Sequence, residues 1–334
     1  MAADANRNEA NKPDTNQLDP NKLVNGRHIG IIGAGLVGAG WAIVFARAGF
    51  PVKIFDAAPG AASASLSLIR SQLEDLHAFG LIDNIDGVMA RMTAVETLQE
   101  AVTDAAYLQE SILEKVDVKR QLMEELEKLT TETTVIGSST SGIPASAFTQ
   151  GLKLAGRTLI AHPVNPPYLV PVVEIVPSPD TSAETVSFTD ALMQAVGQSV
   201  VHVRRETPGF VLNRLQAVLL REAWTLVEEG VASCEDVDKT IRDGLGLRWS
   251  FMGPFETIDL NAPQGVADYA RRFGRLFQEI AHSRTHEQPW SDELIAEVEA
   301  QRRTMLAQDQ LNERRAWRDR QLMSIAATRN RKEN

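Results

Sequence analysis

Residues 30–56 decide the fold and read Gly30-Ile-Ile-Gly-Ala-Gly-Leu-Val-Gly-Ala-Gly-Trp-Ala-Ile-Val-Phe-Ala-Arg-Ala-Gly-Phe-Pro-Val-Lys-Ile-Phe-Asp56. An apolar, β-branched run at 29–32 has the length of a strand, and Gly33-x-Gly35-x-x-Gly38 follows it at once. Apolar residues then recur at helical spacing, and a second short apolar run at 52–55 ends in Asp56. Strand, glycine turn, helix, strand and acid in this order predict a dinucleotide-binding βαβ unit.

The three glycines have separate tasks in such a unit. Gly33 forms the tight turn, Gly35 lets the backbone approach the pyrophosphate, and Gly38 lets the helix pack closely on the strand. The pyrophosphate is expected on the free N–H groups at the start of the helix, which Leu36 and Val37 begin.

Asp56 indicates which dinucleotide binds. It follows Gly33 by roughly 20 residues, where the motif places an acid that accepts hydrogen bonds from the adenosine ribose hydroxyls. A carboxylate there would repel a ribose 2′-phosphate, and Ala57, Ala58 and Pro59 offer no cation to bind one. The predicted cofactor is therefore NAD rather than NADP.

Composition excludes several classes of protein. The chain has 334 residues, of which 43% are hydrophobic and 23% charged, enough for two globular domains. We expect no membrane span and no signal peptide, and the single cysteine, Cys234, fits a reducing cytoplasm. The net charge of −10 argues against nucleic acid or an anionic membrane as a partner.

The order of elements predicts a Rossmann-type, doubly wound, mostly parallel sheet followed by an all-helical domain. Residues 1–25 are rich in Asn and Asp and are predicted to be a disordered tail. Strand and helix patterns alternate over 26–206, and the strand patterns stop near residue 207. Residues 207–330 are therefore the predicted helical domain. Further strands are predicted at 106–112, 133–137, 159–162, 172–176 and 199–203, with helices at 61–80, 118–129, 183–196 and 209–229.

Four polar residues are candidates for the chemistry. His162 stands at the end of a predicted strand, and a histidine exchanges protons near neutral pH, as the removal of a hydroxyl proton requires. Glu174 lies on the next strand, and the intervening turn could bring it beside His162 to orient the ring. Ser141 and Asn213 could form hydrogen bonds with the substrate oxygen.

Each candidate also has a purely structural interpretation. His162 could be an ordinary strand-end histidine, residues 138–141 a hydrogen-bonding turn, and Asn213 a solvent-facing helix residue. A carboxylate in an apolar strand, such as Glu174, needs a partner. His282 and His286 lie four residues apart, but no acidic or cysteine cluster accompanies them, so no metal site is predicted.

At these residues the sequence resembles the 3-hydroxyacyl-CoA dehydrogenase superfamily, and within it the branch of the L-gulonate 3-dehydrogenases and lambda-crystallins. The resemblance covers about residues 28–328. It is carried by Ser138-Ser-Thr-Ser141, Ala161-His-Pro-Val-Asn-Pro-Pro-Tyr168, Val173-Glu-Ile-Val-Pro177, Gly209-Phe-Val-Leu-Asn-Arg-Leu-Gln216, Ala223-Trp-Thr-Leu-Val-Glu-Glu-Gly230, Gly244-Leu-Gly-Leu-Arg-Trp249, Gly253-Pro-Phe-Glu256 and Arg315-Ala-Trp-Arg-Asp319.

The resemblance implies roles for these positions. It makes His162 the general base and Glu174 its orienting partner, with Ser141 and Asn213 as ligands of the substrate oxygen. It also implies a homodimer formed largely through the C-terminal helical domain. On the cofactor side it implies Glu114 and Lys119 beside the nicotinamide, Ser139 within the cofactor-binding motif, and Asn165 supporting the catalytic loop.

Two departures from the family bear on the substrate. Acyl-CoA members usually have Ser-Asn-Thr-Ser where this chain has Ser139 in second place, as the gulonate branch does. The gulonate enzymes usually have a cysteine where this chain has Gly142. The identity of the hydroxy acid therefore stays open.

The charge pattern favours a small hydroxy acid over a coenzyme A thioester. Coenzyme A phosphates usually need Lys or Arg at the pocket rim, yet only Arg70 is basic between Asp56 and Arg91. A small anionic substrate needs one cation, for which Arg248 is the candidate, although it could equally be a surface arginine. Acyl-CoA and carnitine dehydrogenases remain alternatives, with Trp249 able to contact a quaternary ammonium. A crystallin-like structural protein is the alternative outside enzymes.

Overall fold

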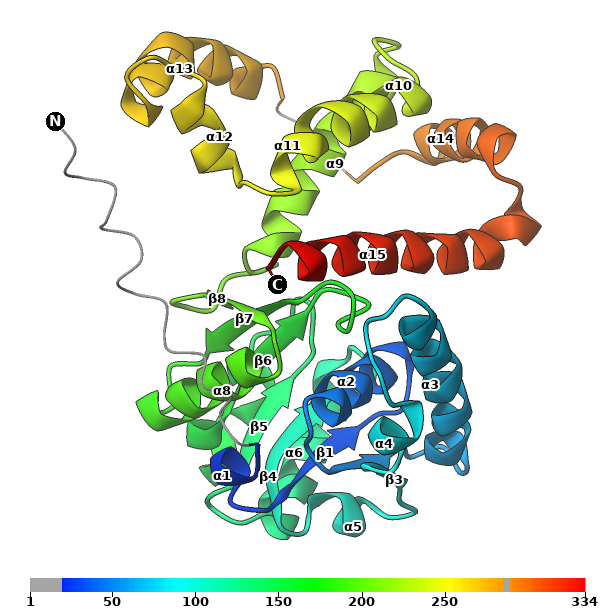
Figure 1. Ribbon diagram of the computed structural model, residues 1–334. Helices are drawn as coiled ribbons and strands as arrows, with labels where there is room; N and C mark the ends of the chain where they lie inside the picture. Colours follow the sequence, from blue (N-terminus) through cyan, green and yellow to red (C-terminus); the bar gives the residue numbers. More distant parts are fainter. Residues whose placement is uncertain (1–19, 285–288, 334) are drawn as a thin grey trace, which may run out of the picture. The chain divides into compact units, whose positions relative to one another are not determined.

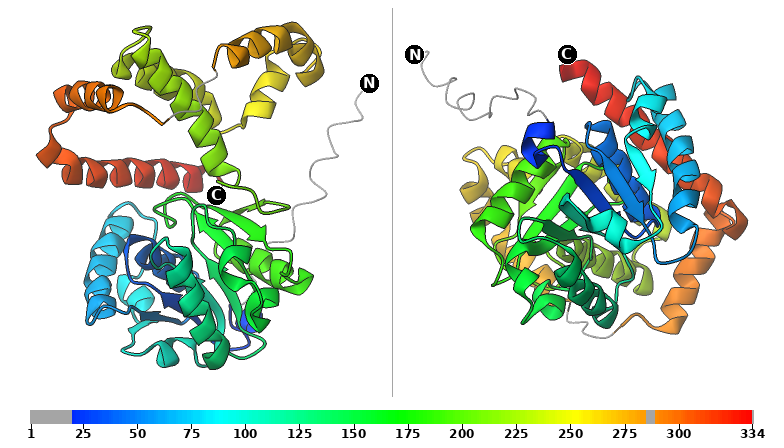
Figure 2. Two further views of the ribbon diagram at one scale, coloured as in Figure 1. Left: turned by 180° about the vertical axis from the view of Figure 1, so that it is seen from behind. Right: turned by 90° about the horizontal axis from the view of Figure 1, so that it is seen from below.

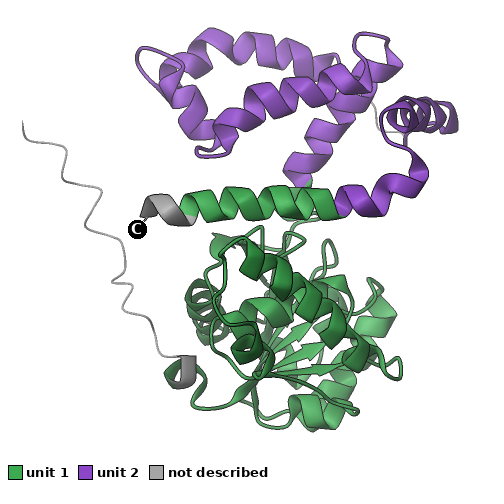
Figure 3. Ribbon diagram, turned by 45° about the vertical axis from the view of Figure 1, so that its right-hand side comes forward, with its two compact units in different colours: residues 1–213, 316–334 green, residues 214–315 purple. Residues whose placement is uncertain are grey.

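The protein divides into two compact units (Figure 1, Figure 3). The computed structural model describes residues 20–284 and 289–333. Unit 1 runs to residue 213 and resumes at residue 316, whereas unit 2 comprises residues 214–315. The helical domain was expected over 207–330; in the structure the beginning of one helix and most of the last one group with unit 1. Most of the tail expected to be disordered at 1–25 lies outside the described residues. Its last part instead forms α1 (Pro20–Val24), because Val24 packs into the core of unit 1.

Unit 1 is built on one eight-stranded sheet with the order β3-β2-β1-β4-β5-β6-β7-β8. Every neighbouring pair is parallel except β6 and β7, which are antiparallel. The predicted doubly wound, mostly parallel sheet is confirmed. The strands are β1 (His28–Ile32), β2 (Val52–Phe55), β3 (Met92–Ala94), β4 (Ala105–Glu110), β5 (Val135–Ser138), β6 (Thr158–Pro163), β7 (Val172–Pro177) and β8 (Ser199–His202).

Two apolar cores cover the two faces of this sheet. Successive strand residues point to opposite faces, so Ala161 packs into one core and Ile160 into the other. The helices are distributed over both faces (Figure 2). The first core contains side chains of α2 (Leu36–Arg47), α3 (Ala61–Ala78) and α8 (Ala183–Ala195); the second contains those of α5 (Leu98–Val102), α6 (Val116–Leu129) and α7 (Ser146–Thr149).

The shortest elements were not expected from the sequence. Strand β3 has three residues, and α4 (Ile85–Met89), α5, α7 and the 3-10 helix η1 (Lys153–Arg157) have four or five residues each. Segments of this length contain too few turns for a hydrophobic period to be recognised. The long helices of unit 1 and α9 were placed within a few residues of the observed bounds, and β2 matches its prediction. No individual bounds were predicted for α13, α14 and α15, which lie beyond residue 229.

Unit 2 consists of helices. Its small core contains Val227, Cys234 and Leu294, against which Trp224 packs, and the rings of Trp224 and Trp290 stack with centroids 4.2 Å apart. Among the described residues, no helix is both long and apolar enough to cross a membrane. The helices are α9 (Leu212–Glu228), which begins in unit 1, α10 (Cys234–Lys239), the π-helix η2 (Thr240–Leu245), α11 (Gly246–Trp249), α12 (Pro254–Leu260), α13 (Val266–His282), α14 (Asp292–Met305), the 3-10 helix η3 (Gln308–Gln310) and α15 (Leu311–Glu333), which ends in unit 1.

Candidate active site

The glycine turn after β1 opens onto a groove in unit 1. Gly33 adopts φ +99°, and a Cβ there would lie 2.5 Å from the carbonyl oxygen of Ser111. A Cβ on Gly38 would lie 1.8 Å from the carbonyl oxygen of Gly33, so only glycine lets α2 start this close to the turn. Gly35, by contrast, faces open space. It also precedes α2 without a side-chain cap, which leaves the first N–H groups of the helix, at Leu36 and Val37, for a ligand.

Asp56 joins the end of β2 to the glycine turn. Its Oδ2 accepts the N–H of Ala34 at 2.7 Å, and its Oδ1 accepts the N–H of Ala58 at 2.9 Å. Asp56 lines a groove of about 810 Å³ together with Gly33, Gly35 and Glu114. The described residues lining that groove include neither lysine nor arginine. The groove therefore fits NAD, because an unphosphorylated ribose needs hydrogen-bond acceptors whereas a 2′-phosphate needs cations.

His162 and Glu174 face each other across the antiparallel pair β6–β7. The strand register pairs these two residues directly, and His162 Nδ1 lies 2.7 Å from Glu174 Oε2. Both side chains are buried, with 6% and 1% of their surfaces exposed. The second oxygen, Glu174 Oε1, accepts the N–H groups of Val211 at 2.8 Å and Leu212 at 3.0 Å, at the start of α9. The structure thus shows the approach of Glu174 to His162 that the sequence suggested.

These contacts set the protonation of the pair. Burial alone would raise the pKa of Glu174, but hydrogen bonds from His162, Leu212 and Val211 outweigh it and hold that pKa below its ordinary value. Because an ionised carboxylate only accepts hydrogen bonds, Nδ1 of His162 is the donor to Glu174, which fixes the Nδ1–H tautomer for the neutral form of the ring. Its Nε2 then keeps a lone pair that can take a proton.

Phe210 is a neighbour of the pair that sequence reasoning missed. Its ring centroid lies 5.6 Å from that of His162, and its side chain is buried. The residue adopts φ +49° directly after Gly209, a left-handed conformation that is uncommon for an aromatic residue. The helix predicted over 209–229 included Phe210, whereas α9 begins at Leu212; Gly209, the first residue of that predicted helix, was the available signal for such a turn.

Ser141 and Asn213 are brought together at the end of β5. The Nδ2 of Asn213 donates to the carbonyl oxygen of Ser141 at 2.7 Å, so the amide fixes the loop backbone. The N–H of Ser141 donates to Glu114 Oε1 at 2.8 Å, and the Ser141 hydroxyl lies 3.3 Å from the same oxygen. Glu114, which lines the groove, therefore also holds the serine loop.

Ser139 belongs to a polar network in the sheet. Its hydroxyl accepts from Gln109 Nε2 at 2.8 Å and lies 2.9 Å from the hydroxyl oxygen of Ser111. The hydroxyl of Tyr107 donates to Gln109 Oε1 at 2.7 Å, and burial raises the pKa of this tyrosine above its ordinary value. Gln109 was overlooked in the sequence, although a polar residue inside an apolar strand indicates such a network.

The remaining predicted residues are not among those that hydrogen-bond to Ser141. Lys119 is buried, does not line the groove and lies 3.6 Å from Glu114 Oε2. Asn165 is exposed in the connection between β6 and β7. Arg248 and Trp249 lie on α11 in unit 2, and both are exposed.

Two alternative locations for chemistry in the described chain, a metal site and a second cavity, are not supported. His286 lies outside the described residues, and within them no cluster of three or more His, Cys, Asp or Glu residues could hold a metal ion.

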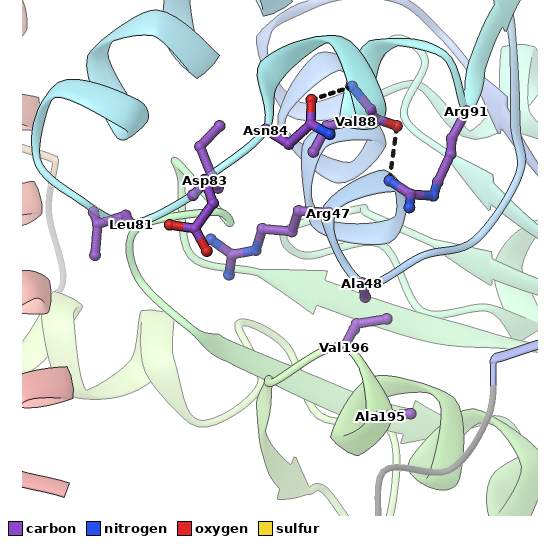
Figure 4. A pocket seen from close by; sticks show the side chains of 11 residues that line it. Arg47, Ala48, Leu81, Asp83, Asn84, Val88, Arg91, Ala195 and Val196 are labelled. Atoms are coloured by element: carbon purple, nitrogen blue, oxygen red, sulfur yellow. Dashed lines mark hydrogen bonds between the residues drawn. The ribbon is translucent and has the colours of Figure 1, made fainter. Parts of the chain in front are cut away.

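A cavity of about 500 Å³ is lined by Arg47 and Arg91 (Figure 4). Both cations already donate to backbone carbonyls, Arg47 to Tyr168 at 3.0 Å and Arg91 to Gly87 at 2.8 Å. This cavity is therefore a poor candidate for catalysis.

Comparison with known proteins agrees with this arrangement. The family profile described as 3-hydroxyacyl-CoA dehydrogenase, NAD binding domain, matches residues 28–207, and the profile of the C-terminal domain of that enzyme matches residues 209–306. The lambda-crystallin homolog of Bos taurus is 40% identical over 291 residues, 86% of this chain and 90% of the relative.

Two further matches concern other substrates. The L-carnitine dehydrogenase of Streptomyces griseus is 40% identical over 236 residues, 70% of each chain. Among solved structures, an NAD+-dependent dismutase described as 5-formyl-3-hydroxy-2-methylpyridine 4-carboxylic acid 5-dehydrogenase superposes with a TM-score of 0.77 at 26% identity. That match covers 90% of this chain and 97% of the other.

Proposed function

The chain belongs to the 3-hydroxyacyl-CoA dehydrogenase family and uses NAD, and from this premise we propose that it oxidises the 3-hydroxyl group of a small L-3-hydroxy acid to the 3-keto acid. The substrate would resemble L-gulonate or L-3-hydroxybutyrate. The observation that carries the proposal is the buried pair of His162 and Glu174, joined at 2.7 Å and fixed by two backbone N–H groups of the segment that starts α9.

The proposed reaction separates a proton from a hydride. NAD, when bound, supplies the acceptor for the hydride that leaves the carbon being oxidised. His162 Nε2 takes the hydroxyl proton, and the carboxylate of Glu174 stabilises the imidazolium that forms. Ser141 and Asn213 orient the substrate oxygen, for which the Ser141 hydroxyl has the freedom to turn from Glu114, 3.3 Å away.

Surface charge supports a small acid rather than a coenzyme A thioester. On α3 the sole basic side chain besides the histidine is Arg70, and it pairs with Asp86 at 3.1 Å. The described helix therefore offers no free cation to a coenzyme A phosphate. We assign the substrate carboxylate to Arg248.

Carnitine is the second candidate substrate. The match to an L-carnitine dehydrogenase is as high in identity, 40%, as the match to the bovine lambda-crystallin homolog. Carnitine combines a 3-hydroxyl group and a carboxylate with a quaternary ammonium, and Trp249 would contact the ammonium. A purely structural role, as the name crystallin suggests for the relatives, fits less well with an intact buried His162–Glu174 pair.

We also propose a homodimer in the cytoplasm. Unit 2 exposes large apolar side chains that a second copy would cover, among them Phe273, Leu276, Phe277 and Ile280 on α13. Cys234 is a buried free thiol, which a reducing compartment preserves.

Substitution of His162 tests the proposed mechanism. His162→Ala should lower kcat by roughly 10²–10⁴-fold while the Kd for NAD stays nearly unchanged, because the base acts on the substrate proton. Glu174→Gln should lose less activity, since the ring remains but is poorly oriented. The matched control is His202→Ala, which removes a partly exposed histidine paired with Asp190 at 3.3 Å. Near-normal turnover of His162→Ala would refute the mechanism.

A further inference from the structure

A buried carboxylate that the proposed reaction does not use lies at the end of β4. Glu110 is 0% exposed and accepts two hydrogen bonds from Lys119 Nζ, at 2.7 Å to Oε1 and 2.9 Å to Oε2. It also accepts the N–H of Ile112 at 2.7 Å and the hydroxyl of Ser138. Neither Glu110 nor Lys119 lines the groove, so Glu110 has no direct access to a ligand there.

Lys119 connects this carboxylate to a second one. Lys119 is 1% exposed, and its ammonium lies 3.6 Å from Glu114 Oε2. The other oxygen, Glu114 Oε1, accepts the N–H of Ser141 at 2.8 Å and the hydroxyl of Thr140. One buried cation therefore bridges the carboxylate in the sheet and the carboxylate that holds the proposed substrate-oxygen ligand.

Hydrogen bonds and the charge of Lys119 favour the ionised form of Glu114. Burial alone would raise the pKa of Glu114, but hydrogen bonds from Thr140 and Ser141 and the charge of Lys119 outweigh it and lower that pKa. A buried ammonium is costly unless it is paired. If Glu110 lost its charge, Glu114 would remain as the one carboxylate of the described residues within 4 Å of Lys119. The ammonium would then move toward Glu114 and compete with the serine loop for it.

We propose that Glu110 is a positioning residue for the substrate oxygen: it anchors Lys119, and Lys119 holds Glu114 where Glu114 fixes Ser141. This proposal rests on the proposed function, in which Ser141 binds the hydroxyl being oxidised. This relay from Glu110 through Lys119 and Glu114 ends at Ser141, and neither Glu110 nor Lys119 lines the groove, so its loss should impair the use of substrate more than the binding of NAD.

A double-mutant cycle between Glu110→Gln and Ser141→Ala tests the relay. Glu110→Gln should lower kcat/KM for the 3-hydroxy acid by roughly 10- to 100-fold, the range for losing a charged contact, and change the Kd for NAD by less than about twofold. In the Ser141→Ala background the same substitution should cost less than about threefold, because the residue through which it acts is gone.

The matched control is another carboxylate on the helix that carries Lys119. Glu127 on α6 accepts the backbone N–H groups of Lys153 and Leu154, and Glu127→Gln should change kcat/KM by less than about twofold in both backgrounds. If Glu110→Gln does not fold, the double variant Glu110→Gln/Lys119→Met removes both buried charges at similar volume and should fold. It should show the same loss of kcat/KM as expected for Glu110→Gln.

The outcomes separate the relay from the proposed function. Three results would overturn the relay in an enzyme that is otherwise active. They are additive losses in the cycle, a Kd for NAD weakened as much as kcat/KM, and full activity of the folded double variant. A wild-type protein that forms no NADH with any 3-hydroxy acid would refute the proposed function itself, and the relay with it.

Discussion

Unit 1 and unit 2 differ in how deeply their side chains are buried and how many hydrogen bonds hold them. In unit 1 the polar groups of the candidate site are buried and bonded on several sides, as Glu174 is by His162, Val211 and Leu212. In unit 2 the described core is small, and α13 has no buried residue although Phe273 and Phe277 lie on it. The comparison shows that the proposed base and its carboxylate partner are held within unit 1 alone, whereas unit 2 exposes apolar side chains on α13.

The apolar face of α13 gives the largest effect expected in unit 2. Phe277 is 50% exposed, and its ring contacts Tyr269 with centroids 6.2 Å apart. If a second copy covers this face, Phe277→Glu should weaken the dimer by roughly 10²–10³-fold, as expected for an aromatic residue at an interface centre. Sedimentation equilibrium measures the change.

The control for this prediction lies on the opposite side of the same helix. Arg275→Gln changes the charge of a largely exposed side chain and should leave the dissociation constant nearly unchanged. A wild-type protein that stays monomeric at micromolar concentration would show that the face of α13 does not mediate dimerisation.

Arg248 tests whether unit 2 contributes to the choice of substrate. A charge-assisted contact to a carboxylate contributes about 1.5–3 kcal/mol, so Arg248→Met should lower kcat/KM for small 3-hydroxy acids by roughly 10- to 150-fold. Activity on 3-hydroxybutyryl-CoA, which has no carboxylate at that position, should survive. Both substrates use His162, so equal losses on both would remove Arg248 from the site.

The pH dependence of stability gives the smallest expected effect and concerns unit 1. Because the folded protein lowers the pKa of Glu174 below its ordinary value of 4.5, the ionised carboxylate stabilises the fold fully above that pH. This contribution is lost as the pH falls through the lower pKa of the folded protein. Urea unfolding of wild type and Glu174→Gln at neutral and acidic pH should show a difference that shrinks on acidification. A difference that grows instead would contradict the assigned direction.

The sequence was sufficient where local pattern and chemistry coincide. The run ending in Asp56 placed β1, the glycine turn, α2 and β2, because each step of a βαβ unit has its own residue requirement. The approach of Glu174 to His162 was also foreseeable, since two consecutive antiparallel strands pair residues equidistant from the connection between them.

Contacts between distant segments could not be predicted in this way. Lys119 lies on an amphipathic helix, where a lysine ordinarily faces water, and its burial depends on Glu110 in another element. The return of residues from 316 onward to unit 1 likewise depends on packing, in which Met323 joins the core of the sheet. No periodicity in the sequence encodes such partners.

The most direct test of the proposed function is NADH formation by the wild-type protein with a panel of substrates. The panel contains L-gulonate, L-3-hydroxybutyrate, L-carnitine and 3-hydroxybutyryl-CoA, each with NAD at saturating concentration, and kcat/KM is measured for each from absorbance at the NADH band. We predict the highest kcat/KM with one of the two small hydroxy acids, L-gulonate or L-3-hydroxybutyrate. A higher value with the coenzyme A thioester, or no NADH with any member of the panel, would contradict the account.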